Sequence, residues 1–282
     1  MSVSSPQSPL VLKFGGELLE DAAQLESVVA SVARIRSSRS PVVIVHGGGK
    51  EIDAGLAAAG IAKRQVDGLR LTDEATLEVV VSVLGVVNTR FVAALNMADV
   101  AAVGLTGADG SCGLVDVAPA HRASDGRVVD LGRVGVPSDR ADTRLLSTLA
   151  SAGFVPVVAC IGLGPDGKLL NVNADTFAGH VAARLGAGRL VIAGTTPGVL
   201  DENGATLKLL DGDQVERLIA GRAATAGMIA KLRACEHALA QGVGDVVIVD
   251  GRDATALEGA AIGRLTEMAT RVIAAESARM KD

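Results

Sequence analysis

The chain has 282 residues, of which 49% are hydrophobic and 21% are charged, and its formal net charge is −5. This much apolar material in a chain of this length supports a sizeable core in one large or two medium domains. The acidic balance, with no basic cluster, excludes a surface that binds nucleic acid.

Polar residues 1–8 lack the apolar run of a signal peptide, and we expect no apolar stretch long enough to span a bilayer. A cytoplasmic protein without a membrane partner is therefore expected. Cys112, Cys160 and Cys235 lie far apart in apolar or helical contexts, which indicates buried thiols in a reducing compartment.

Strand-like β-branched runs alternate with alanine-rich helical stretches along the chain. This pattern is typical of a parallel sheet with crossover helices, an α/β fold. We expect strands at 10–14, 42–45, 101–105, 155–159, 189–193 and 246–250. We expect helices at 22–36, 49–59, 74–97, 142–152, 174–186, 213–220 and 227–241. Two segments rich in Gly, Asp and Val, 111–135 and 160–172, predict β-hairpins added to the same sheet.

Two of the expected strands run into glycine-rich turns that precede helices. The first turn is KFGGE at residues 13–17, and the second is HGGGK at residues 46–50. Glycine allows the backbone N–H groups to approach an anion, and the N-terminus of the following helix is positively polarised. Two such turns in one sheet predict two anionic groups held face to face.

The chain resembles the amino acid kinase family, and within it the acetylglutamate kinases, from Leu10 to about Arg252. The resemblance is carried by seven blocks in order: KFGG at 13–16, HGGG at 46–49, GLRLTD at 68–73, GLTGADG at 104–110, NVNAD at 171–175, PGVL at 197–200 and GMIAK at 227–231. It implies a three-layer αβα sandwich with a mostly parallel central sheet. It also implies an N-terminal lobe, residues 1–187, for the acyl amino acid and dimerisation, and a C-terminal lobe, residues 188–282, for the nucleotide.

The resemblance implies a reaction in which the γ-phosphoryl group of ATP passes to the side-chain carboxylate of N-acetyl-L-glutamate, as a step of arginine biosynthesis. Two anions must meet in such a reaction, so cations have to surround them. In the family pattern Lys13 and Lys231 stabilise the transition state. Asp175 orients both lysines and does not act as a base, because the reacting carboxylate is already ionised. On sequence grounds alone, Asp175 also suits the N-terminus of a helix.

The same resemblance assigns the binding residues. The acyl amino acid is expected at Arg70, at Asn171 and at the backbone of Gly48 and Gly49. An arginine suits a carboxylate because its planar fork donates two parallel hydrogen bonds. The nucleotide is expected at seven further residues: Gly15, Gly16, Thr195, Gly198, Val199, Leu200 and Met228.

Mg²⁺ is expected to enter with ATP, bound largely through phosphate oxygens. No protein metal site is expected, because the four histidines, at positions 46, 121, 180 and 237, share no metal-ligand spacing and suit structural or surface roles. Thr195 lies in the segment where relatives commonly carry an aspartate. We expect the loss of this acidic group to affect nucleotide affinity.

Two alternatives remain open from the sequence. Kinases for N-succinylglutamate, or for aminoadipate or glutamate bound to a carrier protein, share the scaffold but have a different acyl pocket. A non-catalytic amino-acid sensor would also keep the fold. The joint presence of Lys13, Asp175 and Lys231 argues against a sensor, which has no use for transition-state charges.

The resemblance also implies a homodimer paired through the helix at 74–97. We expect its interface at five apolar residues of helical spacing: Leu77, Val80, Val81, Leu84 and Val87. Arginine-inhibited relatives carry an extra N-terminal helix. Residues 1–9 contain two prolines and are unlike a helix-forming segment. We therefore expect a dimer with little inhibition by arginine.

Overall fold

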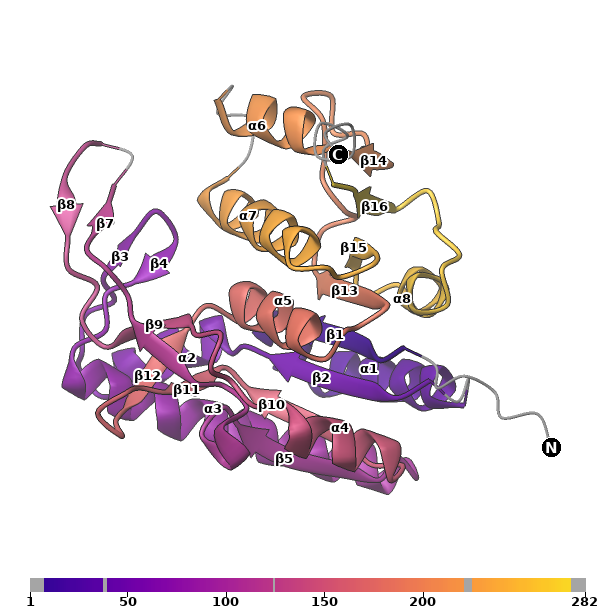
Figure 1. The fold of residues 1–282 in the computed structure, drawn as a ribbon, viewed down its shortest axis with the longest axis horizontal. Coiled ribbons are helices and arrows are strands. Elements are labelled where there is room, and N and C mark those ends of the chain that lie inside the picture. Colours follow the sequence, from indigo (N-terminus) through magenta and orange to yellow (C-terminus); the bar gives the residue numbers. More distant parts are fainter. Residues whose placement is uncertain (1–7, 38–39, 124, 221–224, 275–282) are drawn as a thin grey trace.

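The computed structural model describes residues 8–37, 40–123, 125–220 and 225–274. A central sheet runs through the molecule, and helices cover both of its faces (Figure 1). In the described residues this sheet has eight strands, in the spatial order β14 (Leu209–Leu210), β16 (Ala269–Val272), β15 (Val246–Asp250), β13 (Arg189–Gly194), β1 (Leu10–Phe14), β2 (Val42–His46), β10 (Val155–Ala159) and β5 (Ala102–Thr106). All neighbours pair in parallel except β15 with β16. The prediction of an α/β fold with a mostly parallel sheet is confirmed.

The helices follow the expected alternation. They are α1 (Ala22–Arg36), α2 (Gly49–Ala58), α3 (Glu74–Met97), α4 (Arg144–Ser151), α5 (Ala174–Arg184), α6 (Gly212–Ala220), α7 (Ala226–Ala240) and α8 (Ala254–Ala261), with 3₁₀ turns η1 (Gly16–Leu18) and η2 (Asp109–Ser111). Side chains cap several N-termini: Asp21 caps α1, Asp73 caps α3, and Asn173 caps α5. The sequence analysis missed three short elements near the C-terminus, namely α8, β14 and β16.

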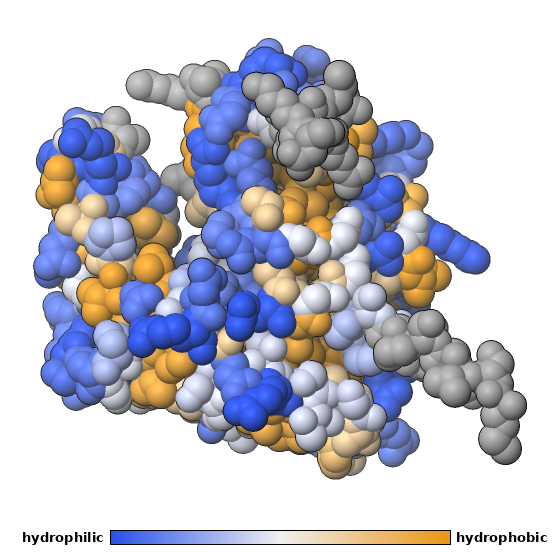
Figure 2. All heavy atoms as spheres, viewed as in Figure 1, coloured by the Kyte–Doolittle hydropathy of each residue, from blue (hydrophilic) through white to orange (hydrophobic). Residues whose placement is uncertain are grey.

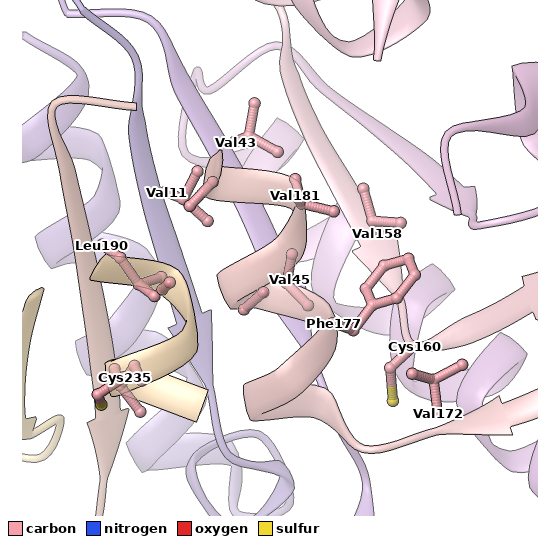
Figure 3. Close-up of a cluster of buried hydrophobic side chains, with 14 of the residues drawn as sticks. Val11, Val43, Val45, Val158, Cys160, Val172, Phe177, Val181, Leu190 and Cys235 are labelled. Carbon is pink, nitrogen blue, oxygen red and sulfur yellow. The ribbon is translucent and has the colours of Figure 1, made fainter. Parts of the chain in front are cut away.

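Successive side chains of each strand pack in different cores on the two faces of the sheet. Val11 of β1 belongs to the core under α5 and α7, whereas Leu12 and Phe14 belong to the core under α1 and α8. Figure 3 shows Phe177 and Val181 of α5 pointing toward the valines of β1, β2 and β10. Because both faces are covered, the strands are nearly continuous β-branched runs, and this made them recognisable in the sequence.

The segments expected as hairpins do not extend the central sheet, so that prediction is wrong. They form a separate four-stranded sheet in the described residues, in the order β11 (Ile161–Leu163), β12 (Leu169–Val172), β9 (Val134–Pro137) and β6 (Val115–Val117). β11 leaves the central sheet directly after β10 and pairs with β12, whose other edge is taken by β9. The backbone N–H and C=O groups of these strands therefore pair within the smaller sheet and not with the central sheet. Two small hairpins, β3 (Gln65–Val66) with β4 (Leu69–Arg70) and β7 (His121–Arg122) with β8 (Val128–Val129), lie beside this sheet (Figure 1).

Helix α3 corrects two expectations. It has 24 residues with a hydropathy of 1.7 in its most apolar window, so by length and composition it could cross a membrane, contrary to the sequence analysis. Its apolar face packs instead in the cores of the chain, as the core helix of a globular protein does. Four of the five residues expected at a dimer interface are buried there: Leu77, Val80, Leu84 and Val87. Val81 is partly buried and packs against the core that contains Val80 and Leu84, so this face is used mainly within the chain.

Candidate active site

The carboxyl ends of β1, β2 and β13 lie together at one edge of the central sheet, because the three strands are parallel neighbours. The amide of Gly15 donates to the carbonyl of Ala193 at 3.0 Å, and the amide of Gly47 donates to that of Phe14 at 3.2 Å. A Cβ on Gly16 would lie only 2.5 Å from the Cα of Gly48, so the two glycine-rich turns are in backbone contact. Figure 2 shows the surface hollowed between the β3–β4 and β7–β8 hairpins and helices α6 and α7.

Three of the predicted site residues meet at this edge. Lys13, in β1, places its Nζ 2.8 Å from Oδ1 of Asp175. Lys231, one turn into α7, places its Nζ 3.2 Å and 3.3 Å from the two oxygens of the same carboxylate. Asp175 stands in the first turn of α5, whose cap Asn173 accepts from its backbone amide at 3.0 Å. One carboxylate thus holds two ammonium groups from distant elements.

Burial and charge compete in this triad. Burial by itself would raise the pKa of Asp175, but the two lysine charges hold that pKa well below its usual range. Burial opposes the charged form of Lys13, yet the charge and hydrogen bond of Asp175 outweigh it, and the pKa of Lys13 is raised. Burial lowers the pKa of Lys231, and the charge of Lys13 adds to this effect against that of Asp175. The paired Asp175 therefore stays ionised across the neutral and mildly acidic range.

A cavity of about 380 Å³ lies next to the triad. It is lined by Asn173, Ala174 and Thr176, the sequence neighbours of Asp175. The rest of its lining combines the second glycine turn, the β3–β4 hairpin and the smaller sheet: Gly47, Gly48, Gly49, Ile52, Gln65, Gly68, Leu69, Arg70, Ala118, Leu131, Val134, Gly135, Val136, Cys160, Asn171 and Val172. A Cβ on Gly49 would meet nothing within 4 Å, so packing does not require glycine there and the backbone is open to a ligand.

Arg70 brings a positive charge to the cavity with its orientation already set. Its side chain is 9% exposed, and its Nη2 donates to Oδ1 of Asp53 at 2.5 Å and to the carbonyl of Gly49 at 3.4 Å. Its other terminal nitrogen, Nη1, is buried and has no acceptor among the described residues. A buried donor without an acceptor is costly, and an anionic ligand in the cavity would satisfy it.

Asn171 is held through a hydroxyl group that links it to the Arg70 backbone. Its Nδ2 donates to Oγ1 of Thr72 at 3.1 Å, and that hydroxyl donates to the carbonyl of Arg70 at 3.1 Å. Thr72 is 1% exposed, so this chain is sheltered from water. It connects strand β12 to the β3–β4 hairpin and fixes the Asn171 amide at the cavity wall.

The second glycine turn starts from a buried imidazole. Nδ1 of His46 lies 3.0 Å from the carbonyl of Gly47, and Nε2 lies 3.0 Å from Nδ2 of Asn88, which donates to the carbonyl of Val157 at 2.9 Å. Burial lowers the pKa of His46 to about 4, although the Gly47 hydrogen bond works in the opposite direction. A neutral imidazole that donates from Nδ1 and accepts at Nε2 fits both contacts.

The residues expected at the nucleotide lie outside the cavity. Thr195, Gly198, Val199 and Leu200 follow β13, and Met228 lies in the first turn of α7. Gly198 has a φ of +73°, and a Cβ there would lie 2.4 Å from Oγ1 of Thr270, so this position requires glycine. Val199 is 2% exposed, which leaves only its backbone for a ligand.

Sequence reasoning missed several side chains that shape the site. Asp53 and Thr72 orient the expected ligand contacts, Asn88 fixes His46, and Glu17 lies against the first glycine turn. Thr72 and Glu17 stand inside quoted sequence blocks but were given no role, and the partners of Asp53, Thr72 and Asn88 lie on other elements, which the sequence does not reveal. The three cysteines are buried free thiols, as expected, and the pKa of each is raised by burial to about 12.

Comparison with known proteins identifies the family. The model of the amino acid kinase family matches residues 8–250. The chain belongs to the amino acid kinase family. Among curated members, it is 40% identical over 252 residues to the acetylglutamate kinase of Novosphingobium aromaticivorans, covering 86% of this chain and 83% of that one. It is 41% identical over 250 residues to the acetylglutamate kinase of Acidiphilium cryptum, with the same coverage. The resemblance stated from the sequence is confirmed.

Solved structures show the same amino acid kinase fold. N-acetylglutamate synthase from Neisseria gonorrhoeae, complexed with coenzyme A and N-acetyl-glutamate, superposes with a TM-score of 0.80 at 26% identity. The match covers 94% of this chain, which spans 59% of the length of that synthase. Carbamate kinase from Giardia matches with a TM-score of 0.68 over 96% of this chain at 16% identity, a likeness of fold alone.

Proposed function

We propose that this member of the amino acid kinase family is an acetylglutamate kinase. It transfers the γ-phosphoryl group of ATP to the side-chain carboxylate of N-acetyl-L-glutamate, giving N-acetyl-L-glutamyl 5-phosphate and ADP, in arginine biosynthesis. Relatives that carry this name match most of the chain at about 40% identity. The observation that carries the proposal is the Lys13–Asp175–Lys231 triad beside a cavity with a free arginine donor.

The cavity offers a place for the acyl amino acid. Nη1 of Arg70 would take the α-carboxylate, and Asn171 would contact the acyl group. Gly48 and Gly49 stand at the start of α2, where amide groups have no acceptor within the helix, and these amides would hold the reacting carboxylate. The second glycine turn, which would hold that carboxylate, is in backbone contact with the first glycine turn.

The first glycine turn, with Gly15 and Gly16, would hold the phosphates of ATP. Thr195, Gly198, Leu200, Met228 and the Val199 backbone would hold the rest of the nucleotide. Under this assignment the lobe at residues 1–187 binds the acyl substrate and the lobe at 188–282 binds ATP. The central sheet is continuous between the two lobes through the β1–β13 pair, so the two proposed sites would lie side by side.

The reaction needs positioned charge and no general base. A carboxylate oxygen forms a bond to the γ-phosphorus while the bond from that phosphorus to the β–γ bridging oxygen breaks, and ADP leaves. Lys13 and Lys231 would neutralise charge on the transferring phosphoryl group and on the leaving oxygen. Asp175 would keep both ammonium groups in place, since it accepts from each at 2.8–3.3 Å.

Mg²⁺ would arrive with ATP and reduce the negative charge of its phosphates. No group of three or more His, Cys, Asp or Glu side chains in the described part of the chain could hold a metal ion by itself. The open backbone of the glycine turns is compatible with a metal that is bound mainly by phosphate oxygens. The protein would therefore position the phosphates, and the metal with them.

A coupled assay of ADP release tests the proposal and the identity of the acyl group. The substrates are N-acetylglutamate, N-succinylglutamate, free glutamate, N-acetylaminoadipate and carbamate, each with MgATP. We expect the highest kcat/KM with N-acetylglutamate. Preference for the succinyl or aminoadipyl compound would move the protein to a sister kinase, and no turnover with any of them would indicate a sensor.

A homodimer in the cytoplasm is proposed with this function. The solvent-facing side of α3, rather than the buried side named from the sequence, would make the contact. Its exposed small and apolar residues recur along the helix: Ala75, Ser82, Val86, Ala93 and Met97. Val86 and Met97 are 64% and 86% exposed, which a second subunit would reduce. The expectation about an N-terminal helix concerns residues 1–9, of which 1–7 lie outside the described residues.

A further inference from the structure

Glu17 lies in the first glycine turn, where an acidic side chain is unexpected. It is the middle residue of η1, and its carboxylate lies over Gly15 of the turn. A Cβ built on Gly15 would lie 2.3 Å and 2.5 Å from its two oxygens. A Cβ built on Gly194 would lie 3.7 Å from Oε1, so the carboxylate lies beside the ends of both β1 and β13. It occupies the space that the glycine side chains leave open.

This carboxylate has a charge without a dedicated partner. It is partly buried and makes no hydrogen bond or ion pair with any residue that the structure describes. Its charge is felt at Lys13, where it adds to that of Asp175 in raising the lysine pKa against burial. A free carboxylate would repel a polyphosphate held by the same turn. Such a group is useful to a nucleotide site only when a cation accompanies the phosphates.

We propose that Glu17 supplies a carboxylate oxygen to the divalent cation that accompanies the nucleotide. This inference rests on the proposed function. Mg²⁺ keeps several waters and is commonly bound by one or two carboxylates together with phosphate oxygens, so one glutamate at the turn is sufficient. The absence of side chains at Gly15 and Gly194 leaves the carboxylate room to face the phosphates. Glu17 thus makes nucleotide binding depend on the metal.

The test is a comparison of ADP binding with and without Mg²⁺. Isothermal titration calorimetry would measure the Kd of ADP in excess Mg²⁺ and in EDTA, for the unchanged protein and for Glu17→Gln. We expect the substitution to reduce the gain in affinity due to Mg²⁺ by about tenfold, because it removes the charged ligand. In EDTA the variant should bind ADP more tightly, because the repulsion is gone.

Glu26→Gln is the matched control, since Glu26 is exposed on α1 away from the turn. The dependence of its ADP affinity on Mg²⁺ should equal that of the unchanged protein. Thermal unfolding of Glu17→Gln should change little, because no hydrogen bond or ion pair with a described residue is lost. If Glu17→Gln tightened ADP and Mg·ADP equally, the carboxylate would only repel phosphate and the inference would be wrong. If the unchanged protein bound no ADP under either condition, the proposed function would fail with it.

Discussion

At the scale of single residues, the site depends on the charge of one buried carboxylate. Taking an aspartate and two lysines out of water is costly, and the cost is offset only by short contacts between opposite charges. Asp175 is 8% exposed and Lys13 is 6% exposed, so water screens this pair weakly. The two lysines carry one charge more than Asp175 neutralises, and the site therefore favours an anion near them.

Removing either lysine should therefore slow turnover much more than it weakens binding. We expect Lys13→Ala and Lys231→Ala each to lower kcat at least about a hundredfold, because the lost charge acts mainly on the transition state. Steady-state kinetics with N-acetylglutamate and MgATP checks this. Lys168→Ala, at an exposed lysine, is the control and should keep full activity. Normal kcat in either site variant would refute the assignment of these lysines.

Arg70 and Asp53 should affect one substrate selectively. We expect Arg70→Ala to raise the KM for the acyl amino acid by about tenfold or more and the KM for ATP little, because a charged hydrogen bond is lost only in the cavity. Asp53→Asn should give a smaller effect of the same kind, since Asp53 only orients the guanidinium. Equal changes in both KM values would place Arg70 outside the acyl site.

At the scale of elements, the two sides of α3 have different roles: one side packs in the cores of the chain, and the other faces solvent and would contact a second subunit. Its buried side joins both cores, and α2 packs on it closely enough that a Cβ on Gly55 would lie 2.9 Å from Val83. Its outer side remains exposed in the single chain. A substitution on that side should therefore change the oligomeric state and leave the fold intact.

Light scattering of Val86→Asp tests whether the exposed side of α3 makes the dimer contact. We expect the unchanged protein to have the mass of a dimer and the variant that of a monomer, because a charge in a packed interface is costly. Val128→Asp is a fair control, because Val128 and Val86 are both 64% exposed but Val128 belongs to the β7–β8 hairpin. A dimer that survived Val86→Asp would place the interface elsewhere.

At the scale of the whole molecule, stability should fall in mild acid. The folded protein lowers the pKa of His46 from 6.5 to about 4, so the unfolded chain binds a proton between these pH values that the folded chain does not. The free energy of unfolding should therefore decrease as the pH falls from 6.5 to 4, by about 3 kcal/mol for this group. The lowered pKa of His180, due to burial, acts in the same direction.

Urea unfolding at several pH values between 7 and 4 would measure the slope of the free energy of unfolding against pH. His46→Gln keeps an acceptor for Asn88 but does not titrate, so its slope should be shallower than that of the unchanged protein. An unaltered slope in His46→Gln would mean that other groups take up the proton.

Much of this molecule follows from local pattern. Runs such as Val155–Ala159 and Val246–Asp250 are β-branched because both faces of the sheet are covered, and their ends were predicted to the residue. The glycine turns could be named because each is a short segment with its own conformational preference, whereas the site roles of Lys13 and Asp175 were named from resemblance to a family. The wider set of expected site residues came from resemblance to a family.

The remaining features depend on contacts between elements that the sequence leaves far apart. Periodicity showed that α3 has an apolar face, but only packing decided that Leu84 and Val87 lie in the core and Val86 outside it. The second sheet formed because β9 took the free edge of β12, which no local signal encodes. The pairing of Asp53 with Arg70 likewise arises where α2 meets a hairpin. Local sequence sets the conformation of each segment, whereas the partner of a buried polar group is set by the segment that packs against it.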